Sequence, residues 1–136
     1  MLVVDTGVLV AAAARRERHH AQCAELLTSA EPPLVAPVLV VTETAYFLTQ
    51  REGTGAERAF AASIARGELV PEPVEPADWD RIEELVEQYA DLGLGIVDAS
   101  VVAACERLGV TTLATLDHRH FSVVRPRHCE ALELVP

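Results

Sequence analysis

The chain begins with Leu2-Val3-Val4-Asp5-Thr6-Gly7, a short apolar run that ends in polar residues, and a helical pattern, Val8–Ala14, follows at once. The apolar run, bounded by turn-forming Asp and Gly, predicts a strand with polar side chains at its carboxyl end. A helix directly after a strand is the unit from which parallel sheets are built, because the helix returns the chain to the edge where the strand began.

The same alternation continues along the chain. It predicts strands at Leu2–Val4, Leu34–Ala36, Glu68–Pro71, Val110–Leu116 and Leu132–Val135, and helices at Val8–Ala14, His19–Ala30, Pro37–Glu52, Thr54–Arg66, Pro76–Asp91 and Asp98–Leu108. The proline of the third strand favours an edge position. These elements predict a three-layer α/β/α sandwich around a central, mainly parallel sheet. Because no linker interrupts the pattern, we expect one domain over residues 1–136.

Two of the predicted helices have distinct patterns. The helix at Pro76–Asp91 has one apolar stripe, with acidic residues on its other faces: Trp79, Ile82, Leu85, Val86 and Tyr89. This pattern predicts that the stripe is buried and that the acids face solvent. Asp98 is expected to cap the start of the next helix, and Gly109 to end it.

Charge permits a nucleic-acid substrate without favouring one. The net charge is −10, whereas nucleic-acid binders usually carry a basic surface. Nine acids and only one base lie between Glu68 and Asp91, which leaves twelve acids and ten arginines elsewhere. Acids gathered around a divalent cation would reduce the negative charge that RNA meets.

Cysteine content and hydropathy favour a cytoplasmic protein. The three cysteines (Cys23, Cys105, Cys129) are an odd number without metal-ligand spacing, so neither a disulfide framework nor a zinc site is expected. The apolar runs are interrupted well before the roughly 18 residues that a membrane span needs. The first residues lack the basic region of a signal peptide.

Four acids occupy positions where ligands gather. Ligands of parallel α/β sheets collect at the carboxyl ends of the strands, and Asp5 and Asp117 end two predicted strands. Asp98 opens a helix and Glu43 lies inside one. An Asp at such a position is also an ordinary cap or turn residue, but Glu43 lies in an apolar stretch where an unpaired carboxylate is costly. Converging carboxylates would repel one another, and Mg²⁺ or Mn²⁺ relieves that repulsion with the oxygen ligands it prefers.

The sequence resembles PIN-domain proteins and, more narrowly, VapC-type toxins of bacterial toxin–antitoxin systems. The resemblance rests on four ordered blocks that cover nearly the whole length: Val3–Thr6, Thr42–Glu43, Asp98–Ala99 and Thr115–Phe121. It implies a metal-dependent endoribonuclease that hydrolyses RNA phosphodiester bonds. The acidic quartet that would bind one or two Mg²⁺ or Mn²⁺ ions is Asp5, Glu43, Asp98 and Asp117.

Further roles follow from the same resemblance. Residues expected to support the metal site or to contact substrate are Thr6, Thr115, Asp91, His118, Arg119 and His120. Residues expected to hold the RNA backbone are Arg15, Arg16, Arg18 and Arg119. The family also implies a homodimer and a cognate VapB-type antitoxin, with no membrane association. The interface with the antitoxin could include some of four apolar helix residues, although most of them are expected in the core: Val38, Val41, Phe47 and Leu48.

Three other functions are compatible with parts of the sequence. Asp5-Thr6-Gly7 also occurs in aspartic proteases, but their fold is all-β and no second triplet exists here. A phosphoaspartate hydrolase would want a second Asp at position 7 and a lysine, whereas the chain has Gly7 and no lysine. A catalytically inactive PIN-like module that binds protein or RNA stays open as the alternative, although all four acids are present.

Overall fold

The computed structural model describes all residues from Met1 to Pro136. Five short strands form one sheet in the order β3-β2-β1-β4-β5, and every neighbouring pair is parallel. The strands are β1 (Leu2–Val4), β2 (Leu34–Pro37), β3 (Val70–Glu72), β4 (Thr112–Ala114) and β5 (Glu133–Val135). The α-helices are α1 (Thr6–Ala13), α2 (His20–Ser29), α3 (Val38–Glu52), α4 (Thr54–Ala65), α5 (Pro76–Gln88), α6 (Ile96–Leu108) and α7 (His118–Phe121). The predicted α/β sandwich is confirmed, and β3 is an edge strand as expected.

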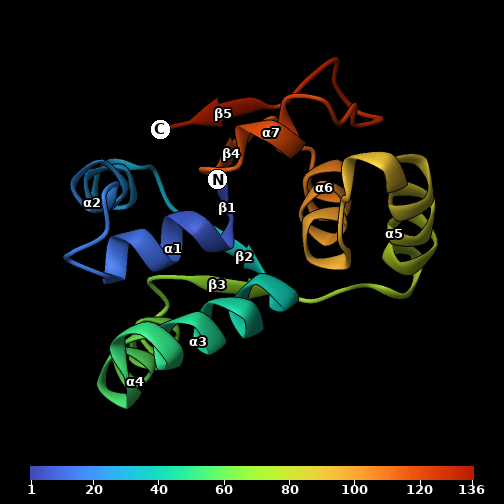
Figure 1. Cartoon of the computed structure of the whole chain (residues 1–136). Helices are drawn as coiled ribbons and strands as arrows, with labels where there is room; N and C mark the ends of the chain where they lie inside the picture. Colours follow the sequence, from blue (N-terminus) through green and yellow to red (C-terminus); the bar gives the residue numbers. More distant parts are fainter.

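Helices cover the sheet on both sides. In Figure 1, α1 and α2 lie on one side of the strands, α5 and α6 lie on the other, and α3 and α4 run together beside β2 and β3. The core is centred on β1 and α6, whose side chains Val3, Val4, Val101 and Val102 are fully buried. Burial from both faces explains why β1 is an uninterrupted apolar run rather than an alternating one.

Asp98 does not cap α6, contrary to the prediction. The helix begins two residues earlier, at Ile96, and the extended Gly95 precedes it without a side-chain cap. Asp98 therefore lies in the first turn of the helix. Its carboxylate lines a cleft instead of accepting hydrogen bonds from the helix start.

The apolar stripe of α5 is narrower than predicted. Ile82 and Leu85 are buried against α6, but Trp79 is 47% exposed. A buried acid lies beside this narrow face: Asp78 accepts a hydrogen bond from the Glu75 N–H and forms an ion pair with Arg107 of α6. The expectation that the acids of this helix are all solvated is therefore wrong for Asp78.

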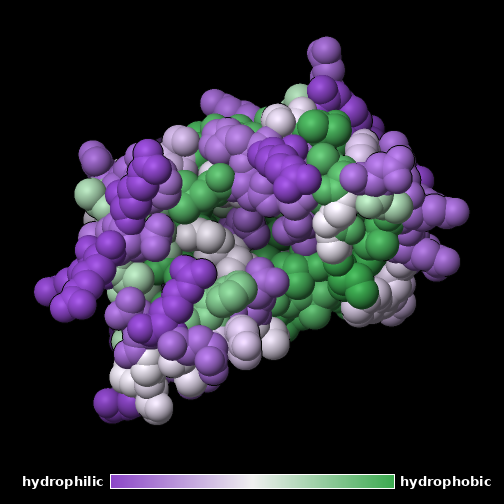
Figure 2. All heavy atoms as spheres, in the orientation of Figure 1, coloured by the Kyte–Doolittle hydropathy of each residue, from purple (hydrophilic) through white to green (hydrophobic).

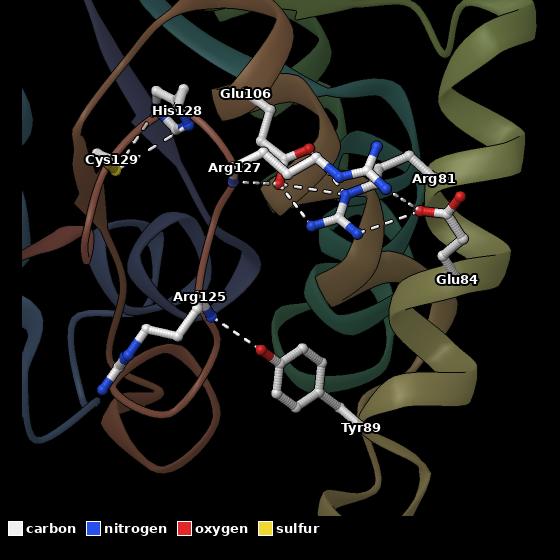
Figure 3. A network of polar contacts seen from close by, with 8 residues as sticks. All are labelled: Arg81, Glu84, Tyr89, Glu106, Arg125, Arg127, His128 and Cys129. Atoms are coloured by element: carbon white, nitrogen blue, oxygen red, sulfur yellow. Dashed lines mark hydrogen bonds and ion pairs between the residues drawn. The ribbon is translucent and has the colours of Figure 1, made fainter.

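A polar network attaches the segment before β5 to α5 and α6 (Figure 3). Arg81 of α5 donates to Glu106 of α6 at 2.8 Å, and the Arg127 N–H donates to the same carboxylate at 3.0 Å. The Tyr89 hydroxyl accepts a hydrogen bond from the Arg125 N–H. Arg81, Arg125 and Arg127 therefore take part in contacts that stabilise the fold.

Two short helical turns were not predicted. The predicted helix Pro76–Asp91 ends at Gln88, and Asp91 lies in the 3₁₀ turn η1 (Ala90–Leu92) that follows. The short helix α7 comes after β4, where the sequence predicted no helix. None of the helices pairs enough length with enough apolar character to cross a lipid bilayer.

Candidate metal centre

The sheet order places a crevice beside β1. The connections lead from β1 to β2 and β3 in one direction, and to β4 and β5 in the other. Ligands of open parallel sheets bind at the carboxyl ends of the strands where the order reverses, which here is between β1 and β4. Asp5 directly follows β1, and Asp117 lies three residues after β4. The topology therefore brings these two acids to the same point.

A cleft of 440 Å³ at this edge is lined by all four acids of the predicted quartet. Asp5 and Asp117 come from strand ends, Glu43 comes from α3, and Asp98 comes from the first turn of α6. The other residues of the lining are Thr6, Gly7, Val10, Ala11, Glu17, Phe47, Arg51 and Leu116. Side chains separated by more than 110 residues in the sequence thus face one space.

Asp5 is the most rigidly held of the four acids. Only 5% of this residue is exposed. Its Oδ1 accepts from the Thr6 N–H and its Oδ2 accepts from the Thr115 hydroxyl, both at 2.8 Å. The same Thr115 oxygen accepts from the Asp117 N–H at 3.0 Å. Thr115 therefore fixes the geometry of Asp5 relative to the turn that contains Asp117.

His120 lies between two of the acids. Its Nδ1 is 2.6 Å from Asp117 Oδ2 and 3.5 Å from Asp98 Oδ2, and its Nε2 is 3.1 Å from the Leu92 carbonyl oxygen. A carbonyl only accepts, so Nε2 must carry a proton. The hydrogen bond with Asp117 is the main cause that raises the pKa of His120 above its ordinary value. We infer that the ring is a cationic partner for the carboxylates.

Burial and mutual repulsion raise the pKa of two acids. Burial is the larger cause for Asp98, and the charges of Asp5 and Asp117 add to it, so that its pKa rises to about 6. Burial also raises the pKa of Asp5, against the opposing effect of its hydrogen bonds to Thr115 and Thr6. A positive charge placed among these carboxylates would stabilise their ionised forms.

The donor set fits a hard divalent cation. Carboxylate oxygens are the ligands that Mg²⁺ and Mn²⁺ prefer. Oxygens of Asp98 and Asp117 lie within 4.8 Å of each other. The His120 ring is not one of the expected ligands, because both of its nitrogens are already hydrogen-bonded. The Thr6 hydroxyl, on a residue that lines the cleft, is buried and has no hydrogen-bond partner, which leaves it free to meet a ligand.

Most of the other predicted residues lie outside the cleft. Asp91, His118 and Arg119 are exposed and none lines the cleft. Arg15, Arg16 and Arg18 are exposed in the connection between α1 and α2, outside the lining. Of the proposed interface residues, Leu48 is fully buried in the core, Val38 is exposed, Val41 is half-buried, and Phe47 lines the cleft.

Sequence reasoning missed two charged residues of the cleft, Glu17 and Arg51. Arg51 had a recognisable signal, because it lies eight residues after Glu43 on a predicted helix, and a spacing of two fours keeps side chains on one face. Glu17 had none, since it lies in the α1–α2 connection among exposed arginines.

Known proteins resemble this chain in sequence and in fold. A model of the PIN domain matches residues 2–125. The protein named ribonuclease VapC26 of Mycobacterium tuberculosis is 34% identical over 125 residues, which cover 92% of this chain and 93% of the relative. The crystal structure of M. tuberculosis VapC20, described as a sarcin-ricin loop cleaving toxin, matches with a TM-score of 0.84 at 21% identity over 100% of both chains.

A second solved structure has the same fold. VapBC2 from Rickettsia felis, bound to a DNA fragment from its promoter, matches with a TM-score of 0.67 at 16% identity, over 98% of this chain and 96% of the other. At these identities the two structures establish the fold alone. The family model and the relative at 34% identity cover more than nine-tenths of the sequence, and the chain therefore belongs to the PIN-domain family.

Proposed function

We propose that the protein is a metal-dependent endoribonuclease and the toxin of a VapBC-type toxin–antitoxin pair. The single observation that carries the proposal is the convergence of Asp5, Glu43, Asp98 and Asp117 on one cleft at the carboxyl edge of the sheet. The identity to a protein named ribonuclease VapC26 supports RNA as the substrate class. Such a substrate would place the activity in the cytoplasm.

Three of the four acids have distinct settings in the proposed reaction. Asp5 is held in one orientation by Thr115 and Thr6, so it would be a preorganised ligand for Mg²⁺ or Mn²⁺. Asp98 and Asp117 would bind the same cation or a second one, with His120 beside them to limit their mutual repulsion. A bound divalent cation would make a nucleophilic water available near neutral pH and offset charge on the phosphate.

The cleft itself governs access of the substrate. The carboxylates of the cleft, the quartet and Glu17, repel a phosphodiester when no cation is bound, because like charges in a partly desolvated space interact strongly. RNA binding at the acids and cation binding are therefore expected to depend on each other. The supporting roles of Thr6, Asp91, His118 and Arg119 remain predictions, and Arg15, Arg16 and Arg18 remain candidates for more distant backbone contacts.

Partners are proposed on the same grounds. A VapB-type antitoxin with a basic, flexible segment would complement the charge of −10. For the homodimer interface, we propose an apolar surface over α5 and α6. In Figure 2 it is the green area on the right, where Figure 1 shows these two helices. Its members Trp79 and Ile96 are 47% and 53% exposed and line one hollow with Val86. Apolar residues gathered in this way commonly mark an interface.

The test is cleavage of total cellular RNA by the purified protein, freed of any antitoxin, with Mg²⁺ or Mn²⁺ and with EDTA. We expect discrete fragments that require the cation and disappear in Asp5→Asn. Glu17→Gln is the matched control, because Glu17 lines the same cleft but lies outside the quartet. Absence of cleavage in both metals would refute the enzyme and favour the inactive binding module.

A further inference from the structure

One face of α3 runs from the acids to a positive charge. Glu43, Phe47 and Arg51 are spaced by four residues, so they lie on the same face of the helix, and all three line the cleft. Arg51 is the one basic residue of that lining. At 1.5 Å per residue, it lies about 12 Å along the helix from Glu43. The cleft is therefore acidic at its centre and basic at this end.

Arg51 is held in place by an aromatic ring. Its guanidinium carbon lies 5.2 Å from the centroid of the Phe47 ring, which is within the range of a cation–π contact. Tyr46 in turn meets Phe47 edge-on, with 5.6 Å between the ring centroids. A planar guanidinium resting on a ring keeps its N–H groups available at the edge. The contact thus orients Arg51 without using its hydrogen-bond donors.

Arg51 has no acidic partner within the chain, although acids line the same cleft. Arg66, Arg81, Arg107 and Arg127 all form ion pairs with glutamates or aspartates. Arg51 is exposed and forms no salt bridge, although the chain has an excess of acids. An unpaired arginine at the end of an acidic cleft has no evident structural role beyond its contact with Phe47.

We propose that Arg51, resting on Phe47, binds a backbone phosphate of the RNA substrate next to the phosphate that meets the carboxylates. This inference rests on the proposed ribonuclease function. Arginine binds phosphate through paired N–H donors, and a cation at this position offsets the repulsion that the acids exert on an approaching strand. Because Arg51 contacts a phosphate that does not react, the contact contributes equally to the ground state and to the transition state. Arg51 therefore affects KM rather than kcat.

Binding is tested first, in an Asp5→Asn background that prevents cleavage, with a fluorescein-labelled single-stranded RNA of mixed sequence and roughly 12 nucleotides. We expect Arg51→Gln to raise the Kd about tenfold, as for the loss of one charged hydrogen-bonded contact. The slope of log K against log salt should fall by about 0.7, the value for one lost phosphate contact to a single strand. Arg51→Lys should retain the slope.

Arg58→Gln is the matched control, because Arg58 is an exposed arginine of α4 that lies outside the cleft. It removes the same charge from the protein and should leave the Kd and the salt slope nearly unchanged. Far-UV circular dichroism of both variants checks that the fold is retained. Equal effects of Arg51→Gln and Arg58→Gln would overturn the proposal, since net charge alone would then explain them.

Cleavage separates this inference from the function on which it rests. With Mg²⁺ and an active protein, Arg51→Gln should raise KM about tenfold and keep kcat. If the wild-type protein cleaves RNA and Arg51→Gln has the same KM, the phosphate subsite alone is refuted. A wild-type protein that neither binds nor cleaves RNA would refute the ribonuclease and the subsite together.

Discussion

Asp98→Asn removes a negative charge that lowers the stability of the folded protein when no metal is bound. Burial and the neighbouring Asp5 and Asp117 raise the pKa of Asp98 from 3.8 to about 6. A tenfold change in proton affinity corresponds to about 1.4 kcal/mol, so the ionised carboxylate lowers the free energy of unfolding by at most about 3 kcal/mol, and by less where solvent screens this half-buried group. Asparagine keeps nearly the same shape without the charge. Without metal at about pH 8, the variant should therefore be more stable than the wild type by up to about 3 kcal/mol.

The difference should depend on pH in a definite direction. Because the folded-state pKa is raised, the folded protein keeps the Asp98 proton while the unfolded chain releases it, so this group makes the wild type less stable as pH rises from about 4 to above 6. The advantage of Asp98→Asn should thus be small near pH 4 and reach its full size above about pH 7. Added Mn²⁺ should reverse the order, because a ligand that binds the folded state stabilises it.

Urea unfolding followed by far-UV circular dichroism, in EDTA and at several pH values, measures this effect. Asp78→Asn is the control, since Asp78 is a buried acid paired with Arg107 away from the cleft. Asp78→Asn removes the charge that pairs with Arg107 and should lower the free energy of unfolding by roughly 2 kcal/mol. If Asp98→Asn were also destabilising in EDTA at high pH, the carboxylates of the cleft would not be in repulsion and the reasoning would fail.

Three further predictions concern other residues. Thr115→Val removes the hydroxyl that bridges Asp5 and Asp117, and should weaken Mn²⁺ binding about tenfold to a hundredfold by titration calorimetry; unchanged affinity would show that Thr115 does not orient the acids. His120→Gln should lower the free energy of unfolding in EDTA more at pH 6 than at pH 9. Because the pKa of His120 is raised in the folded state, its charged form stabilises the fold at low pH, and this contribution is lost as pH rises through the folded-state pKa. The same difference at both pH values would mean that the ring acts as a neutral donor. Trp79→Asp should convert the proposed homodimer to a monomer in light scattering, and an unchanged mass would exclude the α5–α6 surface as the interface.

Much of the fold could be predicted from the sequence because local pattern and burial agree in its centre. Leu2–Val4 is apolar throughout, as a strand covered on both faces must be, and it became β1 with the expected bounds. Errors arose where burial is partial. Trp79 fits the apolar stripe of α5 by spacing, yet α6 covers a narrower face than the stripe, and only the packing of the two helices decides how much is covered.

The sequence predicted the acids of the site and also named Thr6, Thr115 and His120, but it did not predict the contacts that these three residues make. Strand ends direct Asp5 and Asp117 to the carboxyl edge of the sheet, and topology alone brings them together. His120 depends on the short helix α7, which turns its ring toward Asp117 and Leu92, and a four-residue helix has no periodicity to detect. The spacing in the sequence places Arg51 on the helix face of Glu43, but only the structure shows that this face lines the cleft.

The most direct test of the acidic quartet is a Mn²⁺ binding isotherm of the purified protein without RNA, measured by electron paramagnetic resonance of the free ion. We predict saturable binding that weakens at least about tenfold in Asp5→Asn, Asp98→Asn and Asp117→Asn, because each removes a proposed ligand. Glu17→Gln should bind as the wild type does, although Glu17 lines the same cleft. Absence of saturable binding, or equal weakening by Glu17→Gln, would contradict a metal centre formed by these acids.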